Sequence, residues 1–469
     1  MGRKKKELPV LENIEISGVA AEGNALARYN EKVLFVPFGA PGDVVDVKID
    51  KKKHSFLQGH IVGWHKKSPY RIEPRCSHFG ICGGCKWQHL PYQFQLEFKR
   101  QQVIDNLQRI AKVPFPDVAA CLGSQKEWEY RNKVEYTFSN KKWLTFEQIA
   151  SGEEVADRDG AGFHIPGAFD KVLDIEHCYL HDRFGNDLRN FVKEYANKNG
   201  LSFYDLRAQN GFLRILMVRT FSTGDSLVVL SLGEADKEKI EELMKAIDKS
   251  FPDITSLNYV VNTKVNDTIN DLDIVTWKGR DYAEEKLGDL IFRISPKSFY
   301  QTNSLQAFRL YSVVKDMASL TGKELVYDLY TGTGTIANFL ARDCKKMIGI
   351  EYVEDAIVDA RLNSSVNNIE NTEFFAGDMK DILTDEFISK HGRPDVMIVD
   401  PPRAGMHSDV VKVILNAAPL TLVYVSCNPA TQARDIALLS SKYKVDKVQP
   451  VDMFPHTQHV ENVVKLIIK

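Results

Sequence analysis

The chain has 469 residues, which at roughly 150 residues per domain predicts about three domains. Hydrophobic residues make up 43% and charged residues 26%, a balance that excludes a disordered or fibrous chain. The formal net charge is only -2, and taken alone this near-neutrality argues against a dedicated nucleic-acid binder.

Charge is unevenly distributed along the chain. Residues 1–110 contain 18 Lys and Arg and 11 Asp and Glu, so this part carries +7 and the remainder -9. A basic front on an acidic body is typical of proteins in which one part contacts a polyanion. The near-neutral total therefore does not exclude an RNA-binding enzyme.

Membrane and secretion signals are missing from the sequence pattern. No apolar run approaches the roughly 18 residues of a membrane span. The basic start Met1–Glu7 leads into no apolar signal region. The seven cysteines are an odd number in a large chain, which argues for a reducing compartment and against a disulfide framework. We therefore expect a cytoplasmic protein that contacts no membrane.

Residues 8–67 alternate short strand-like runs with turns. Lys32–Pro37 and Val44–Ile49 have the composition of buried strands, and Ala40–Asp43 between them has the chemistry of a turn. Three consecutive lysines, Lys51–Lys53, precede a further strand-like run. This pattern predicts a small β-barrel of the OB type, a fold that commonly binds nucleic acid.

Residues 92–112 have the spacing of an amphipathic helix, and residues 115–290 mix strands with helices. The apolar face of the predicted helix contains Phe94, Phe98, Val103, Leu107 and Ile110. Its basic residues Lys99, Arg100 and Arg109 are expected to face solvent or RNA. The region that follows predicts a mixed α+β domain.

The last 150 residues alternate strand and helix, which indicates a doubly wound parallel sheet. Four predicted strand ends carry polar signals: the Gly332 and Gly334 turn, Glu351, Asp378 and Asp400. Ligands of such sheets bind beyond the carboxyl ends of the strands. We therefore expect these residues to form one binding site.

Two cofactors remain open for this site on the residues alone. A dinucleotide is one, because Glu351 follows the glycines by about 20 residues and could hold a ribose. However, the third glycine of the dinucleotide pattern would fall at Ala337. Glu351, Asp378 and Asp400-Pro-Pro together favour S-adenosylmethionine, and a dinucleotide-dependent oxidoreductase is the alternative.

A cysteine pattern gives the second strong signal. Cys76-x5-Cys82-x2-Cys85 lies among glycines, and Cys178 follows at a distance. Four thiolates suit either an iron–sulfur cluster or a structural zinc ion. Zinc sites usually come as paired short knuckles, so a triplet plus one remote cysteine favours a cluster. Cys121 and Cys344 are interpreted as core residues.

Five motifs occur in order near the carboxyl end: Ser298-Phe-Tyr-Gln-Thr-Asn303, Asp328-Leu-Tyr-Thr-Gly-Thr-Gly334, Asp400-Pro-Pro-Arg-Ala-Gly405, Ser426-Cys-Asn-Pro-Ala-Thr431 and His459-Val-Glu461. They resemble those of the RNA uridine-5-methyltransferases of the RumA/TrmA class, and the resemblance covers nearly the whole chain. Residues 8–67 resemble a TRAM domain, an RNA-binding OB-like fold.

One departure from the family pattern is Thr331, where the family usually has Cys. We expect little effect, because this position lines the cofactor turn through its backbone.

The resemblance implies roles for individual residues. Cys427 would add to carbon 6 of uracil, Glu461 would remove the carbon-5 proton, and Asp400 would support them and contact the cofactor. The family pattern assigns S-adenosylmethionine contacts to Gln301, Tyr330, Gly332, Gly334, Thr335, Glu351, Asp378 and Asp400. Phe299 would stack on a flipped base.

Two neighbouring chemistries fit less well. Amino-group methyltransferases have an aromatic residue after Asp-Pro-Pro, and RNA cytosine-5 enzymes typically have Cys in that motif. Here Arg403 follows, so uridine fits better than adenine or cytosine.

The resemblance also implies architecture and partners. We expect an α/β protein: a TRAM domain with an OB-like β-barrel at residues 8–67, a mixed α+β central domain at 68–290, and a Rossmann-like class I methyltransferase domain at 291–469. Cys76, Cys82, Cys85 and Cys178 would hold a [4Fe–4S] cluster. The expected substrate is 23S ribosomal RNA before transfer RNA, and the expected state is a monomer. A non-catalytic RNA-binding or ribosome-assembly factor with the same fold is the alternative of another class.

Overall fold

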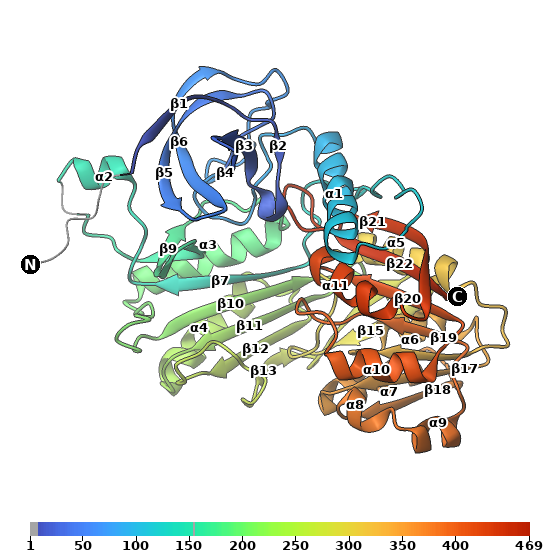
Figure 1. The fold of residues 1–469 in the computed structure, drawn as a ribbon. Coiled ribbons are helices and arrows are strands. Elements are labelled where there is room, and N and C mark those ends of the chain that lie inside the picture. The colour runs from blue at the N-terminus through green and yellow to red at the C-terminus, as the bar shows by residue number, and fades with distance from the viewer. Residues whose placement is uncertain (1–7, 153–154) are drawn as a thin grey trace, which may run out of the picture.

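The computed structural model describes residues 8–152 and 155–469, so the basic start of the chain lies outside it. Figure 1 shows a curved β-sheet near the amino terminus, a long sheet formed by the middle of the chain, and a helix-covered sheet at the carboxyl-terminal end. The predicted α/β class, with an amino-terminal β-unit and a doubly wound carboxyl-terminal sheet, is confirmed.

The amino-terminal sheet has six strands in the order β1-β5-β6-β4-β3-β2. They are β1 (Val10–Glu15), β2 (Gly18–Val19), β3 (Ala25–Tyr29), β4 (Lys32–Val36), β5 (Val44–Lys52) and β6 (Phe56–Lys66), with a 3₁₀ turn, η1 (Ala21–Gly23), after β2. In β5 every second side chain, Val45, Val47 and Ile49, is buried, as expected for a sheet with one solvated face. The buried Asp43 carboxylate accepts hydrogen bonds from Ser68 N (2.8 Å) and Arg71 Nη2 (2.7 Å), which fastens the sheet to the segment that follows.

The central sheet has seven strands in the order β13-β12-β11-β10-β7-β8-β9. They are β7 (Lys133–Ser139), β8 (Gly160–Ile165), β9 (Ala168–Asp174), β10 (Leu213–Thr220), β11 (Ser226–Leu232), β12 (Ser256–Val261) and β13 (Val275–Gly279). The amphipathic helices α3 (Arg183–Lys198) and α4 (Lys237–Ser250) bury Leu188, Val192, Leu243 and Ile247 in one core with this sheet. A short helix, α2 (Phe146–Ala150), lies in a surface loop.

The carboxyl-terminal sheet has the order β18-β17-β16-β19-β20-β22-β21. Its strands are β16 (Leu325–Leu329), β17 (Lys346–Glu351), β18 (Thr372–Ala376), β19 (Val396–Val399), β20 (Thr421–Ser426), β21 (Tyr443–Val451) and β22 (Glu461–Ile468). The five strands from β16 to β20 are parallel, and only β22 and β21 add antiparallel pairing. The hairpin of β14 (Ala283–Leu287) and β15 (Leu290–Ile294) packs beside this unit.

Helices cover both faces of this sheet. One face packs against α5 (Ser304–Ala318), α6 (Thr335–Ala341) and α7 (Glu354–Val366). The other packs against α8 (Met379–Ile382), α9 (Asp385–His391), α10 (Ser408–Ala417) and α11 (Pro429–Leu439). The ends of β16, β17, β18, β19 and β20 consequently meet at one edge, where the sequence predicts a binding site.

Helix α1 (Tyr92–Asn106) continues into a π-helical turn, η2 (Leu107–Ala111). Val103 and Leu107 pack against α11, so this early segment belongs to the carboxyl-terminal core (Figure 1). Arg109 is exposed, but the prediction that Lys99 faces solvent or RNA is wrong. Its side chain is completely buried, and its charge is compensated by Asp452, whose Oδ1 lies 2.5 Å from Lys99 Nζ.

In the part of the chain that the structure describes, every helix is too short or too polar to cross a membrane.

Candidate active site

A cavity of about 1120 Å³ opens at the carboxyl ends of the parallel strands; we call it the strand-end cavity. Its lining includes all of the cofactor and catalytic residues predicted from the sequence except Gly334: Phe299, Gln301, Tyr330, Gly332, Thr335, Glu351, Asp378, Asp400, Cys427 and Glu461. Gly334 caps α6 instead, where its φ of 72° and the nearby Ala360 leave no room for a side chain. The topology thus unites residues that are spread over more than 160 positions of sequence.

The turn after β16 forms one wall of the cavity. Tyr330 has a positive φ of 63°, an uncommon conformation for a residue with a side chain and one that is often found at functional sites. Gly332 also has a positive φ, and a Cβ added there would meet open space, so its backbone borders the cavity directly. Gly332 N donates to Glu351 Oε2 (3.2 Å) and Val353 N donates to Glu351 Oε1 (3.0 Å), which fixes this acid at the end of β17.

Asp378 and Phe299 border the outer part of the cavity. The Asp378 side chain caps α8 by accepting from Lys380 N (3.2 Å), and it also pairs with the Lys380 ammonium group. These contacts lower its pKa, so the carboxylate is charged at neutral pH. The Phe299 ring is 69% exposed, far more than a core aromatic residue, and is therefore available to stack on a planar ligand.

The three predicted catalytic residues come from three strands. Asp400 follows β19, Cys427 follows β20, and Glu461 is the first residue of β22. The antiparallel β20–β22 ladder ends with Ser426 paired to Asn462, and Cys427 and Glu461 are the residues directly beyond this last pair. Register therefore brings Cys427 and Glu461 close together, and the charge of Glu461 acts on the Cys427 thiol.

Electrostatics in the cavity favour neutral forms. Burial raises the pKa of Asp400 to about 7, and burial together with the nearby Asp400 raises the pKa of Glu461 to about 8. Burial and the same two acids raise the pKa of the Cys427 thiol to about 11. A base that titrates near neutrality suits proton transfer at physiological pH.

Arg403 contacts Cys427 and His459, and neither Arg403 nor His459 was predicted from the sequence as a site residue. The Arg403 side chain hydrogen-bonds Cys427, and its positive charge lowers the pKa of that thiol, opposing the two acids. Arg403 Nη2 lies 3.2 Å from His459 Nδ1, while burial and Arg403 lower the pKa of His459 to about 4 and keep this imidazole neutral. Their positions inside the Asp-Pro-Pro-Arg and His-Val-Glu motifs are the sequence feature that could have identified them.

Asp328 is a further buried acid next to the cavity. Burial raises its pKa to about 7, and Thr331 Oγ1 donates to its Oδ2 (2.5 Å), while its buried Oδ1 has no protein partner. Thr331, the residue that departs from the family pattern, therefore acts through its hydroxyl group as well as through its backbone.

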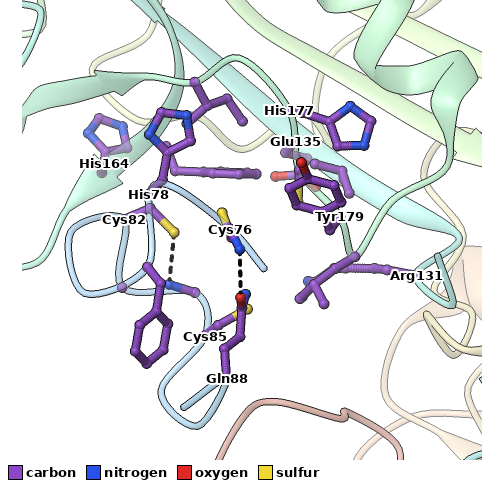
Figure 2. A pocket seen from close by; sticks show the side chains of 18 of the residues that line it. Cys76, His78, Cys82, Cys85, Gln88, Arg131, Glu135, His164, His177 and Tyr179 are labelled. Atoms are coloured by element: carbon purple, nitrogen blue, oxygen red, sulfur yellow. Dashed lines mark hydrogen bonds between the residues drawn. The ribbon is translucent and has the colours of Figure 1, made fainter. Parts of the chain in front are cut away.

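A second cavity, of about 600 Å³, lies between the segment after β6 and the central sheet; we call it the cysteine cavity. Cys76, Cys82, Cys85 and Cys178 all line it, and Figure 2 shows the sulfur atoms of the three labelled cysteines directed toward the same space. Burial raises the pKa of Cys76, Cys178 and Cys85, the last to about 12, and repulsion between the thiols adds to this. Cys121 and Cys344 lie in other cores, as predicted.

The loops around the cysteine cavity are held in place by hydrogen bonds. Cys76 N donates to Gln88 Oε1 (3.1 Å), and Cys178 N donates to Asn186 Oδ1 of α3 (2.7 Å). Among residues 8–152 and 155–469, no group of three or more His, Cys, Asp or Glu side chains is arranged to hold a single metal ion. The four thiols thus share a cavity without converging on one point.

Comparison with protein families gives two matches. A model of the tRNA (uracil-5-)-methyltransferase family matches residues 277–469, and a model of the TRAM domain matches residues 12–62.

Two relatives and one solved structure span nearly the full chain. An RNA methyltransferase of Bacteroides thetaiotaomicron is 56% identical over 454 residues, which are 96% of this chain and 100% of that protein. One from Porphyromonas gingivalis is 55% identical over 461 residues, covering 97% and 99%. The crystal structure of the Pyrococcus abyssi tRNA (uracil-54, C5)-methyltransferase with S-adenosyl-L-homocysteine aligns with a TM-score of 0.74 and 29% identity, covering 97% of this chain and 99% of that one.

Proposed function

Because the chain belongs to the TRAM-containing RNA (uracil-5-)-methyltransferase family, whose chemistry uses S-adenosylmethionine, we propose that it makes 5-methyluridine in RNA. The observation that carries this proposal is the register that sets Cys427 beside Glu461 in the strand-end cavity. Uracil carbon 5 is a poor nucleophile, so the reaction needs a thiolate, a base and a methyl donor in one place.

The proposed reaction has three steps: addition of the thiol, methyl transfer and elimination. Cys427 Sγ forms a bond to carbon 6 of uracil, and the electron pair of the carbon 5–carbon 6 double bond becomes available at carbon 5. Carbon 5 then takes the methyl group, and S-adenosylhomocysteine leaves with the electrons of the broken sulfur–methyl bond. Glu461 accepts the carbon-5 proton, the double bond re-forms, and Cys427 departs as a thiolate.

Residues around the cavity prepare these steps. Arg403 favours the thiolate form of Cys427, because its positive charge lowers the pKa of the thiol whereas the charges of Glu461 and Asp400 raise it. The pKa of about 8 at Glu461 matches a base that accepts a proton at carbon 5 and later returns it to solvent. The exposed ring of Phe299 would stack on a uridine flipped out of the RNA.

The cofactor wall fits S-adenosylmethionine, which supplies an electrophilic methyl group when bound. Glu351, held by two backbone N–H groups, would accept hydrogen bonds from ribose hydroxyls. The backbone at Gly332 leaves room for close approach. Gln301, Tyr330, Thr335, Asp378 and Asp400 complete the proposed contacts.

Substitutions at the two central residues test the mechanism. We expect Cys427→Ala to form no covalent adduct with 5-fluorouridine RNA, and we expect Glu461→Gln to form the adduct with natural RNA but to release product slowly. An adduct in the first variant, or release at the wild-type rate in the second, would overturn the respective assignment. Methyl transfer from labelled S-adenosylmethionine to bulk RNA distinguishes the enzyme from a non-catalytic RNA-binding factor.

We propose that Cys76, Cys82, Cys85 and Cys178 hold a [4Fe–4S] cluster. The support is chemical: four thiols line one cavity, and the ligands of a cluster lie farther apart than those of one metal ion. Methyl transfer is redox-neutral, so the cluster would hold the surrounding loops together. Anaerobically purified protein should contain iron and labile sulfide, and zinc without either would overturn this proposal.

For the substrate we propose 23S ribosomal RNA, on the combination of the cysteine pattern with the amino-terminal β-unit. Transfer RNA is the second candidate, favoured by the similarity to a tRNA (uracil-54, C5)-methyltransferase. Mass mapping of 5-methyluridine in both RNA classes from cells that lack this protein decides between them, because the modification disappears only from the true substrate.

We further propose a division into residues 8–67 for RNA binding, 68–290 for the cluster and further RNA contacts, and 291–469 for methyl transfer. We propose that the protein works in the cytoplasm as a monomer, which sedimentation and cell fractionation would test.

A further inference from the structure

The loop that leads to Glu461 is unusually buried. It comprises residues 452–460 and joins β21 to β22, where Val451 pairs with Glu461 at its two ends. Asp452 and Met453 are 0% exposed and His456 is 2% exposed, although connecting loops normally lie on the surface. The loop also borders the strand-end cavity through Phe454.

Helix α1 holds the start of this loop with a buried ion pair. Lys99 and Asp452 are both 0% exposed, and Lys99 Nζ lies 2.5 Å from Asp452 Oδ1. Lys99 Nζ also donates to Phe454 O (3.0 Å), and Tyr92 OH donates to Asp452 Oδ2 (2.8 Å). Buried ion pairs contribute little net stability compared with apolar packing, so their better-attested effect is to select one arrangement of the chain.

The middle of the loop is held in a strained conformation. His456 has a positive φ of 65°, which a residue with a side chain adopts only when its surroundings impose it. His456 N donates to Gln95 Oε1 of α1 (2.8 Å), and His456 O accepts from Lys86 N (2.9 Å) and Trp87 N (3.0 Å). The Trp128 ring stacks on the imidazole with centroids 3.9 Å apart.

Helix α1 also supports the other side of the active site. Val103 and Leu107 share a core with Ala433 and Ile436 of α11, the helix that begins two residues after Cys427. One helix from the amino-terminal half of the chain thus braces both the segment after the nucleophile and the loop before the base.

We propose that Lys99 and Gln95 are positioning residues that hold the 452–460 loop so that Glu461 faces carbon 5 of the substrate uracil. This inference rests on the proposed role of Glu461 as the base. Neither side chain lines the strand-end cavity, so both act through the loop. Loosening the loop should slow removal of the carbon-5 proton while leaving thiol addition and methyl transfer intact.

The test compares Lys99→Met and Gln95→Met with Gln101→Met, a control at an exposed, uncharged position of α1. The RNA probe is bulk RNA from cells that lack this protein, and the methyl donor is tritium-labelled S-adenosylmethionine. For both loop variants we expect kcat to fall about ten-fold, the KM for S-adenosylmethionine to stay within about two-fold, and methylated RNA to accumulate on the protein in denaturing gels. Gln101→Met should behave as wild type.

A merely structural role gives a different result. In that case the variants would lose thermal stability and total activity together, without protein-linked methylated RNA, and the proposal would be overturned. If Lys99→Met does not fold, the double variant Lys99→Met/Asp452→Leu replaces it, because it leaves no unpaired charge in the core. A double variant with wild-type kcat would also overturn the proposal.

Glu461→Gln, run in parallel, separates the two levels of inference. If it accumulates protein-linked RNA and the loop variants do not, the base assignment stands and the positioning role fails. If Glu461→Gln accumulates no protein-linked RNA, the proposed role of Glu461 as the base is wrong, and the positioning role that rests on it is wrong as well.

Discussion

The strand-end cavity and the cysteine cavity differ in how their residues come together. Three of the four thiols of the cysteine cavity lie within residues 76–85, and only Cys178 comes from elsewhere. Glu351, Asp378, Asp400 and Glu461 of the strand-end cavity lie at the ends of four different strands, so this cavity exists only when the whole sheet is assembled. A short motif can therefore signal the first kind of site, whereas the second depends on topology.

The two cavities also use burial differently. In the strand-end cavity, burial raises the pKa of Asp400 to about 7 and that of Glu461 to about 8, within reach of physiological pH. In the cysteine cavity, burial raises the pKa of Cys85 to about 12, far from any physiological proton exchange. The two cavities therefore differ in which groups can exchange protons near neutral pH, which agrees with the roles proposed above. Four predictions test this separation.

The largest effect is expected from loss of the nucleophile. Cys427→Ala should lower kcat by about 10⁴-fold or more, because no other group in the cavity can add to carbon 6. Methyl transfer to bulk RNA measures it. Cys344→Ala, which removes a buried thiol that lines neither cavity, is the matched control and should retain nearly full activity.

A smaller effect is expected at the cofactor wall. Glu351→Ala removes a carboxylate that is positioned for ribose hydroxyls, so binding of S-adenosylmethionine should weaken by about 10- to 100-fold. Isothermal titration calorimetry measures the affinity. Unchanged affinity would place the cofactor elsewhere in the cavity.

The charge balance at Cys427 can be read from its reaction with iodoacetamide. Burial raises the pKa of the thiol most, the Glu461 and Asp400 anions raise it further, and Arg403 lowers it. Glu461→Gln should therefore increase the thiolate fraction and make alkylation at pH 8 about ten-fold faster. Arg403→Gln should have the opposite effect. Peptide mass spectrometry at Cys427 follows the rate, and equal rates in all three proteins would contradict the assigned balance.

The smallest effect is expected on binding of S-adenosylmethionine when a residue of the cysteine cavity is changed. Cys82→Ser should abolish iron and labile sulfide and lower the thermal stability. The affinity for S-adenosylmethionine should nevertheless remain within about two-fold of wild type, because the cofactor wall shares no residue with the cysteine cavity. A large loss of affinity would show that the cavities are coupled, and Phe454, which contacts both surroundings, would be the first residue to examine.

Much of this architecture could be predicted from local pattern. The βα alternation after residue 320 and the acids at strand ends implied a doubly wound sheet with a site at its edge, because such sheets always gather their strand ends on one side. Gly334 could not be separated from Gly332 by sequence, since which glycine borders the cavity depends on how tightly α6 packs on Ala360.

Long-range contacts account for what sequence could not predict. Lys99 lies in a helix whose pattern favours an exposed cation, and only Asp452 reverses that expectation. Arg403 belongs to the Asp-Pro-Pro-Arg motif and favoured uridine as the substrate base, but its influence on Cys427 arises only where the ends of β19 and β20 meet. Such pairings follow from topology, which no local window of sequence contains.

The hydrogen bonds from α1 to the 452–460 loop span 353 to 361 residues. At a translation rate of about 5–20 residues per second, the partners of α1 are synthesised roughly 20 to 70 seconds after α1 itself. A ribosome-bound chain that ends before residue 452 lacks the 452–460 loop, Glu461 and β22. The carboxyl-terminal sheet and the strand-end cavity are therefore completed only in the final moments of synthesis.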